Sequence, residues 1–316
     1  MAEVKKMATR DGYGKALVEL GKEHQDIVVL DADLAGSTKS GMFGKAYPGR
    51  HFNCGIAEAD MMCVAAGLAA AGMTPFASSF AMFAAGRAFE QVRNCIGYPH
   101  LNVKIGATHA GITVGEDGAT HQCNEDIALM RTIPGMVIIN PADATEAYAC
   151  VEAALKHDGP VYLRFGRYAV PDLTAELEGY TFELGRGVTY CDGTDVTLIA
   201  TGVMSSFAYE AASVLREEGI SARVINIHTI KPIDKEIIVK AARETGAIVT
   251  AEEHNIIGGL GSAVMEVVSE ECPVPVVRVG VQDLYGRSGT VPELMRAYGL
   301  TTEDIVSAAK RAIAKK

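Results

Sequence analysis

Short runs of apolar residues alternate with longer segments of helical periodicity along the first half of the chain. The apolar runs cover residues 27–34, 74–79, 103–111, 136–143 and 161–166. The helical segments cover residues 57–71, 82–96 and 144–156. Apolar runs of this kind are typical of strands buried on both faces of a parallel sheet. The pattern predicts a doubly wound α/β domain over residues 1–170.

The pattern changes after this domain and then resumes. Pro171, several acidic residues and the alternating stretch YTFELGRGVTY (180–190) predict a connecting arm over residues 171–194, with one hairpin. Further apolar runs lie at residues 196–201, 222–230, 247–254 and 274–281. They predict a second, smaller doubly wound α/β domain over residues 195–316. A length of 316 residues is ordinary for two domains.

Composition and charge exclude some functions. Apolar residues make up 48% of the chain and charged residues 22%, which is a globular balance. The formal net charge is −10 and no basic tract is present, so we expect no binding to nucleic acid. Small anionic substrates remain compatible with this charge, because a few arginines in one cleft outweigh a diffuse negative surface.

Targeting signals and cysteine usage indicate a reduced cytoplasmic location. The first residues, MAEVKKMATRDGYG, contain no apolar segment of the signal-peptide type. The longest apolar stretch, residues 61–73, is too short to cross a membrane. Seven cysteines, none of them spaced C-x-x-C, argue against a disulfide framework or a zinc site.

Two segments contain residues whose role the local sequence leaves open. Glu58 precedes the apolar segment MMCVAAGLAAAG, so it either lies exposed in the first turn of a helix or is buried against a specific partner. Phe80 and Phe83 are three residues apart, so on a helix they would share one face. Core packing is the usual reason for such a pair, although a flat heterocycle could also stack there.

A turn-rich loop, THAGITVGEDGATHQ (108–122), follows a predicted strand and contains His109, Asp117 and His121. Loops at the carboxyl ends of parallel strands bind ligands in α/β proteins. These three side chains could also ligate a metal, although their irregular spacing gives this little support. Arg167 follows another strand at the same sheet end, where it is either a solvated surface charge or a ligand for phosphate or carboxylate.

In order along the chain, GIAEADM (55–61), PFASSFAMF (75–83) and the loop 108–122 resemble the C-terminal half of transketolases. The resemblance extends over nearly the whole chain. It implies a thiamine-diphosphate pyrimidine-binding domain with a parallel sheet, followed by the smaller transketolase C-terminal α/β domain. It also implies transfer of a two-carbon ketol unit from a ketose phosphate to an aldose phosphate, as in the pentose phosphate pathway.

The resemblance assigns cofactor roles to four residues. Glu58 corresponds to the catalytic carboxylate that hydrogen-bonds N1′ of the aminopyrimidine and so promotes formation of the reactive ylid. Phe80 and Phe83 correspond to the pyrimidine pocket, and Asp33 to an aspartate near the cofactor. Where many transketolases have a tyrosine in this pocket, the chain has Gly86.

The resemblance also assigns residues to the substrate. Asp117 corresponds to a residue that binds a sugar hydroxyl, and His121 to a catalytic residue near the donor carbonyl. The positions expected to hold the sugar phosphate are Arg10, Ser37, His109 and Arg167. This phosphate-binding set favours transketolases over the β subunits of 2-oxoacid dehydrogenases, and together with the loop 108–122 over deoxyxylulose-phosphate synthases.

The chain has no Gly-Asp-Gly motif, which in this superfamily precedes an Asn that binds Mg²⁺ and the diphosphate. The resemblance therefore implies the C-terminal subunit of a split transketolase, inactive alone. Its partner is expected to be an N-terminal subunit carrying the Gly-Asp-Gly motif and Mg²⁺, in an α₂β₂ complex. Alternatives are a subunit of a related thiamine-diphosphate enzyme, either synthase or 2-oxoacid dehydrogenase, and a non-catalytic scaffold.

Overall fold

The apolar runs of the first half form one sheet. In the computed structural model, which describes residues 6–316, its strands pair in the order β12-β6-β7-β5-β4-β2-β3. Neighbouring strands are parallel, except that β12 runs antiparallel to β6. The strands are β2 (Ile27–Asp31), β3 (His51–Asn53), β4 (Thr74–Phe80), β5 (Lys104–Thr108), β6 (Val137–Ile139), β7 (Val161–Arg164) and β12 (Thr229–Lys231).

Helices cover both faces of this sheet. Ile27 and Val29 pack with side chains of α1 and α7, whereas Val28 and Leu30 pack on the opposite face with side chains of α4. The helices are α1 (Thr9–Glu23), α2 (Ala35–Thr38), α3 (Gly41–Ala46), α4 (Glu58–Ala70), α5 (Phe89–Gln91), α6 (Asp126–Arg131) and α7 (Ala144–Lys156). Shorter turns are η1 (Pro48–Arg50), η2 (Met82–Arg87), η3 (Val92–Gly97), η4 (Ile112–Asp117) and η5 (Thr174–Glu176), of which η2 and η3 are π-helical.

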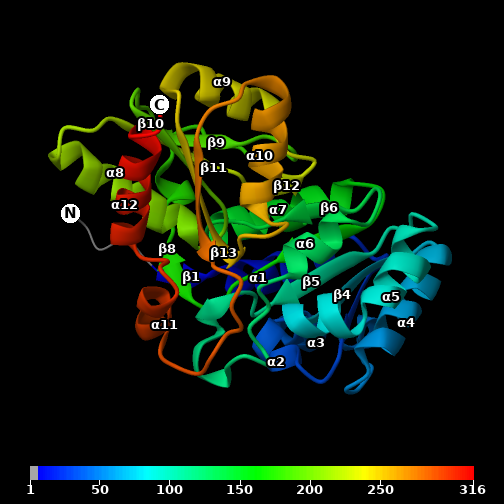
Figure 1. Ribbon diagram of the computed structural model, residues 1–316. Helices are drawn as coiled ribbons and strands as arrows, with labels where there is room; N and C mark the ends of the chain where they lie inside the picture. Colours follow the sequence, from blue (N-terminus) through cyan, green and yellow to red (C-terminus); the bar gives the residue numbers. More distant parts are fainter. Residues whose placement is uncertain (1–5) are drawn as a thin grey trace.

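A second sheet has the order β14-β13-β10-β11-β9 and is parallel except for β9. Its strands are β9 (Val188–Cys191), β10 (Val196–Ala200), β11 (Ala222–Asn226), β13 (Ile248–Asn255) and β14 (Val276–Val281). Its helices are α8 (Met204–Glu217), α9 (Lys235–Thr245), α10 (Leu260–Glu271), α11 (Val291–Ala297) and α12 (Thr302–Ile313). Side chains of α8 and α12 pack on one face, and those of α9 and α10 on the other. In Figure 1 this sheet lies above the first.

The predicted fold class, two doubly wound α/β domains with the smaller one second, is confirmed. Two details differ. The run 222–230 forms two strands, because β11 pairs within the second sheet while β12 completes the first. The predicted hairpin in residues 171–194 is absent from the described structure. Strand β9 pairs with β11 instead, and β8 (Ala169–Pro171) pairs with β1 (Lys6–Ala8).

Candidate active site

The carboxyl edge of the first sheet brings together side chains that are far apart in the sequence. Asp33 follows β2, Phe80 is the last residue of β4, His109 follows β5 and Arg167 follows β7. These four strands are neighbours in the order β7-β5-β4-β2 and run in the same direction. Parallel neighbours end at the same edge, which is where open α/β sheets bind ligands.

Four rings form a continuous aromatic cluster at this edge. The rings of Phe80 and His109 are stacked with centroids 3.8 Å apart, and Phe83 is stacked 5.9 Å from Phe80. His121 meets Phe83 edge-on, with centroids 5.3 Å apart. Phe80 and His109 are buried, whereas Phe83 and His121 are half-buried. The cluster therefore combines core packing, at Phe80, with a partly open aromatic face at Phe83.

Glu58 is buried and paired. It is the first residue of α4 and is 1% exposed, so of its two predicted situations the structure has the buried one. Arg87 Nη1 donates to Glu58 Oε2 at 2.8 Å, and the same guanidinium lies 4.7 Å from the centroid of the Phe83 ring. Arg87 thus connects the carboxylate to the aromatic cluster. Arg87 is four residues from Phe83 on a helical segment, a spacing that places two side chains next to each other. This spacing was not used in the sequence analysis, and Arg87 was therefore missed as a site residue.

Gly86, the position where many transketolases have a tyrosine, is next to Arg87 in the same π-helical turn. A Cβ atom at Gly86 would lie 2.3 Å from Met82 Cε. The Met82 side chain therefore fills space that a larger residue at position 86 would need.

Arg10, Ser37 and His109 are in direct contact. Arg10 Nη1 donates to the Ser37 carbonyl oxygen at 2.9 Å and to His109 Nε2 at 3.0 Å. Because arginine is only a donor, Nε2 is the acceptor and the proton is on Nδ1, which lies 2.9 Å from Thr108 Oγ1. Burial, followed by the charges of Arg10 and Arg167, lowers the pKa of His109 to about 3. The imidazole is therefore neutral at physiological pH.

Arg167 and Asp117 form the open side of this group. Arg167 Nη1 donates to the Val114 carbonyl oxygen at 2.7 Å and lies 3.5 Å from Asp117 Oδ2. Both side chains are about two-fifths exposed, at 39% and 42%. A guanidinium that keeps free N–H groups in such a position suits an anionic ligand. Arg164, by contrast, is not a solvated charge but is buried and paired with Asp126 at 2.8 Å.

Two of the predicted site residues have left-handed backbone conformations. Asp33 has φ 62° and His109 has φ 55°, which is uncommon for residues other than glycine and is often found at functional sites. The Asp33 carboxylate accepts a hydrogen bond from Asn53 Nδ2 at 3.1 Å, and Asp33 N donates to Asn53 Oδ1. Asn53 therefore holds Asp33 at the end of β2.

Within residues 6–316 no group of three or more His, Cys, Asp or Glu side chains is arranged to hold a metal ion. The metal hypothesis for His109, Asp117 and His121 thus gains no support from the described geometry. None of the helices in the described part of the chain is both long and apolar enough to span a membrane.

The chain is similar to known proteins over nearly its whole length. The family model "Transketolase, pyrimidine binding domain" matches residues 5–172, and "Transketolase, C-terminal domain" matches residues 185–305. A transketolase C-terminal section of Methanocaldococcus jannaschii is 51% identical over 94% of this chain and 93% of that protein. A 6-deoxy-6-sulfo-D-fructose transketolase subunit of a Clostridium species is 44% identical over 97% of this chain and 95% of that protein.

A solved structure of similar fold agrees with these relatives. It is described as a split gene transketolase, inactive beta4 tetramer, and it is 55% identical with a TM-score of 0.91. The alignment covers 98% of this chain and 99% of that one. This chain therefore belongs to the transketolase family of thiamine-diphosphate enzymes, as a subunit of the split type.

Proposed function

We propose that this chain is the C-terminal subunit of a split transketolase that transfers a two-carbon ketol unit between sugar phosphates. The observation that carries the proposal is the arrangement at the sheet edge. The Arg87 guanidinium connects the buried carboxylate of Glu58 to the partly open ring of Phe83. Arg10 and Arg167 lie beside the neutral His109 on the same edge.

The donor set fits the aminopyrimidine of thiamine diphosphate. The Phe83 ring would stack on the pyrimidine, and Glu58 would share a proton with its N1′ atom in a hydrogen bond shielded from water. When bound, thiamine diphosphate supplies the carbon nucleophile that the ketol unit needs. This chain would supply Glu58 as the group that holds and moves the proton. Asp33 and Phe80 would form part of the surrounding pocket.

The substrate's anionic end would bind at the group formed by Arg10 and Arg167, with Ser37 and His109 orienting it. His109 would take part as a neutral group, because its Nε2 atom accepts a hydrogen bond from Arg10. Asp117 would accept a hydrogen bond from a sugar hydroxyl, and His121, at the rim of the aromatic cluster, would contact the donor near its carbonyl.

The partner proposed is an N-terminal subunit that carries the Gly-Asp-Gly motif and binds Mg²⁺ and the diphosphate. The proposed assembly is α₂β₂ and cytoplasmic, and this chain is inactive without its partner. The proposed domains are residues 1–170 and 195–316, joined by the arm 171–194. Support comes from the relatives of the split type, which match 94% and 98% of this chain.

The test is an assay of this chain with and without its co-purified partner, for ketol transfer from xylulose 5-phosphate to ribose 5-phosphate. We expect activity only with both chains, thiamine diphosphate and Mg²⁺. A complex that binds the cofactor yet transfers no ketol unit from any sugar phosphate would contradict the proposal. An Arg167→Met variant serves as the control for anion recognition, with a raised KM expected for the phosphorylated sugars.

A second candidate substrate is a sugar sulfonate. The observation that favours it is the placement of two guanidinium groups, Arg10 and Arg167, beside His109, where a sulfonate would present the same three-oxygen face as a phosphate. A relative at 44% identity is named for 6-deoxy-6-sulfo-D-fructose. Comparing kcat/KM for fructose 6-phosphate and for 6-deoxy-6-sulfofructose in the assembled complex decides between the two donors.

A further inference from the structure

The loop that carries Asp117 and His121 is held by the second domain. Its first turn, η4, begins at Ile112, and the backbone N–H of Thr113 donates to Glu253 Oε1. Glu253 lies on β13 of the second sheet and is 3% exposed. A Cβ atom at Gly111 would lie 2.4 Å from this carboxylate, so the loop backbone is packed directly against it.

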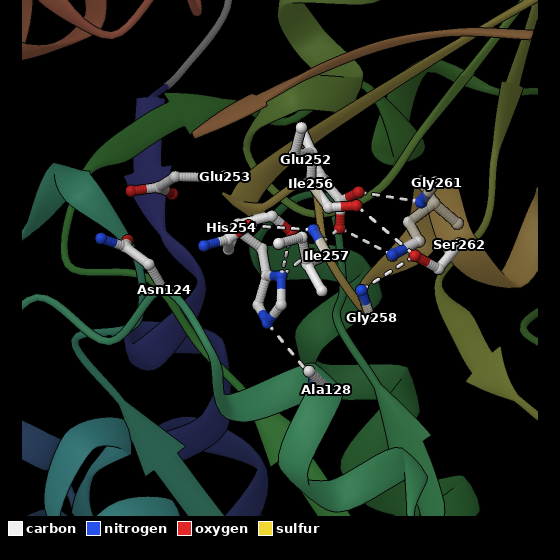
Figure 2. A network of polar contacts seen from close by, with 12 residues as sticks. Asn124, Ala128, Glu252, Glu253, His254, Ile256, Ile257, Gly258, Gly261 and Ser262 are labelled. Atoms are coloured by element: carbon white, nitrogen blue, oxygen red, sulfur yellow. Dashed lines mark hydrogen bonds and ion pairs between the residues drawn. The ribbon is translucent and has the colours of Figure 1, made fainter. Parts of the chain in front are cut away.

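The far end of the loop is tied to the same strand. Asn255 N donates to the Asn124 carbonyl oxygen at 2.7 Å, and Ala128 N lies 3.3 Å from His254 Nε2. Figure 2 shows this end of β13, with Asn124 and Ala128 of the first domain beside it. Successive residues of one strand thus hold both ends of the segment that contains the two substrate-side residues.

The last residue of the loop, Gln122, contacts both the middle of the loop and the second domain. Gln122 Nε2 donates to the Gly115 carbonyl oxygen at 3.2 Å and to the Arg287 carbonyl oxygen at 3.0 Å. Gly115 has φ 85°, and Gly118 has φ 78°, so the backbone between the two ends follows a path with left-handed turns that favour glycine. Such a path depends on external contacts to keep one conformation.

Glu252, the neighbour of Glu253, makes its contacts within the second domain. Its carboxylate accepts hydrogen bonds from Leu260 N at 2.6 Å and Gly261 N at 2.8 Å, at the start of α10. Successive side chains of a strand point to opposite faces, and in Figure 2 Glu252 and Glu253 lie on opposite sides of β13. Glu252 therefore stabilises the second domain internally, whereas Glu253 contacts the loop of the first.

We propose that Glu253 is a positioning residue for the substrate side of the site, and that the second domain acts through it to hold the loop bearing Asp117 and His121. This inference rests on the proposed ketol transfer for its effect on KM. The contact itself is independent of that activity. An unpartnered Thr113 N–H would let the loop sample other conformations, because a buried backbone donor without an acceptor is costly.

The experiment compares Glu253→Ala, Glu253→Gln and Glu252→Ala in the full chain, by hydrogen exchange and then by kinetics with the partner subunit. We expect Glu253→Ala to increase exchange of residues 112–122, and Glu253→Gln, which keeps an acceptor oxygen, to restore most of the protection. Glu252→Ala should increase exchange at residues 259–261 and leave 112–122 protected. If Glu253→Ala fails to fold, Glu253→Asp takes its place in the comparison. Aspartate is one methylene shorter, so its carboxylate lies farther from the Thr113 N–H.

In the assembled complex, Glu253→Ala should raise KM for the sugar phosphates on the order of 10-fold, with the Kd for thiamine diphosphate unchanged. Equal effects of Glu253→Ala and Glu252→Ala on KM or on exchange of residues 112–122 would overturn the proposal. If the wild-type complex transfers no ketol unit, the proposed function fails, while the exchange of residues 112–122 still decides the role of Glu253.

Discussion

A neutral His109 has a measurable consequence for stability. Its pKa falls from 6.5 to about 3 on folding, because the ring is buried beside Arg10 and Arg167. Between these two pH values the unfolded chain binds a proton that the folded chain does not, so the free energy of unfolding decreases as the pH falls below 6.5. Near pH 5, about 1.5 pH units below 6.5, the loss amounts to about 2 kcal/mol, at 1.36 kcal/mol per unit.

The assay is urea unfolding of the wild-type chain and of His109→Gln, each at about pH 7.5 and pH 5. Glutamine keeps an acceptor for Arg10 but does not titrate, so the variant should lose about 2 kcal/mol less stability between the two pH values. Burial also lowers the pKa of His228 and of His254, each to about 4. Both histidines are present in both proteins, so their contributions cancel in the difference. An equal loss of stability in the two proteins would refute a neutral, buried His109.

The same reasoning applies to binding. If His109 does not titrate between pH 5 and 8, it contributes nothing to an inflection of KM near pH 6, whereas the second ionisation of the substrate phosphate falls in this range. A sulfonate has no ionisation in this range, so KM for a sulfonated donor should be independent of pH as far as His109 is concerned. An inflection with the sulfonate that disappears in His109→Gln would contradict the assignment.

Three further variants test the site and its support. Glu58→Gln should lower kcat of the assembled complex by about 10²–10⁴-fold, the usual contribution of a positioned proton-transfer group, and a loss below threefold would exclude that role. Arg87→Ala removes the half-exposed partner of Glu58, so the carboxylate no longer has to leave an ion pair to bind the cofactor. Calorimetry should therefore show thiamine diphosphate binding about twofold to fivefold tighter. Weaker binding would mean that Arg87 holds the cofactor. Asp126→Asn removes the charge paired with the buried Arg164, and should lower the free energy of unfolding in urea by about 3–5 kcal/mol. A decrease of less than about 1 kcal/mol would mean that the ion pair contributes little to stability.

The strands could be predicted because burial on both faces requires continuous apolar sequence. Val28 and Val29 are consecutive residues that pack into different core clusters, so both positions are apolar. The hairpin prediction was wrong although the alternation behind it is present. The Tyr180 hydroxyl donates to Glu146 Oε1 at 2.9 Å, and the Phe182 ring packs tilted against His228 with centroids 4.2 Å apart. Alternate side chains are therefore used in packing without a strand partner.

The site could be predicted as far as its residues fall in short segments. Glu58 and Phe83 lie in such motifs, and the resemblance of these motifs to transketolases assigned roles that the local sequence alone left open. The contacts that orient them could not be predicted, because they join positions far apart in the chain. Arg87 and Glu58 are 29 residues apart, and Thr113 and Glu253 are 140 apart. A one-dimensional pattern contains no signal for such pairs.

Strand β12 shows the same limit and leads to a last prediction. Ile230 is 2% exposed within the core cluster of the first sheet, and Lys231 Nζ donates to the Arg131 and Ile133 carbonyl oxygens at 2.9 Å and 2.6 Å. Ile230→Ala should therefore reduce the protection of β6 amides from hydrogen exchange by about 2–5 kcal/mol. Ile238→Ala, equally buried but within the second domain's own cluster, is the matched control. A larger effect of Ile230→Ala on β6 protection would mean that the second domain supports the first sheet through β12. If both variants reduce β6 protection equally, the chain opens as one unit and β12 makes no separate contribution.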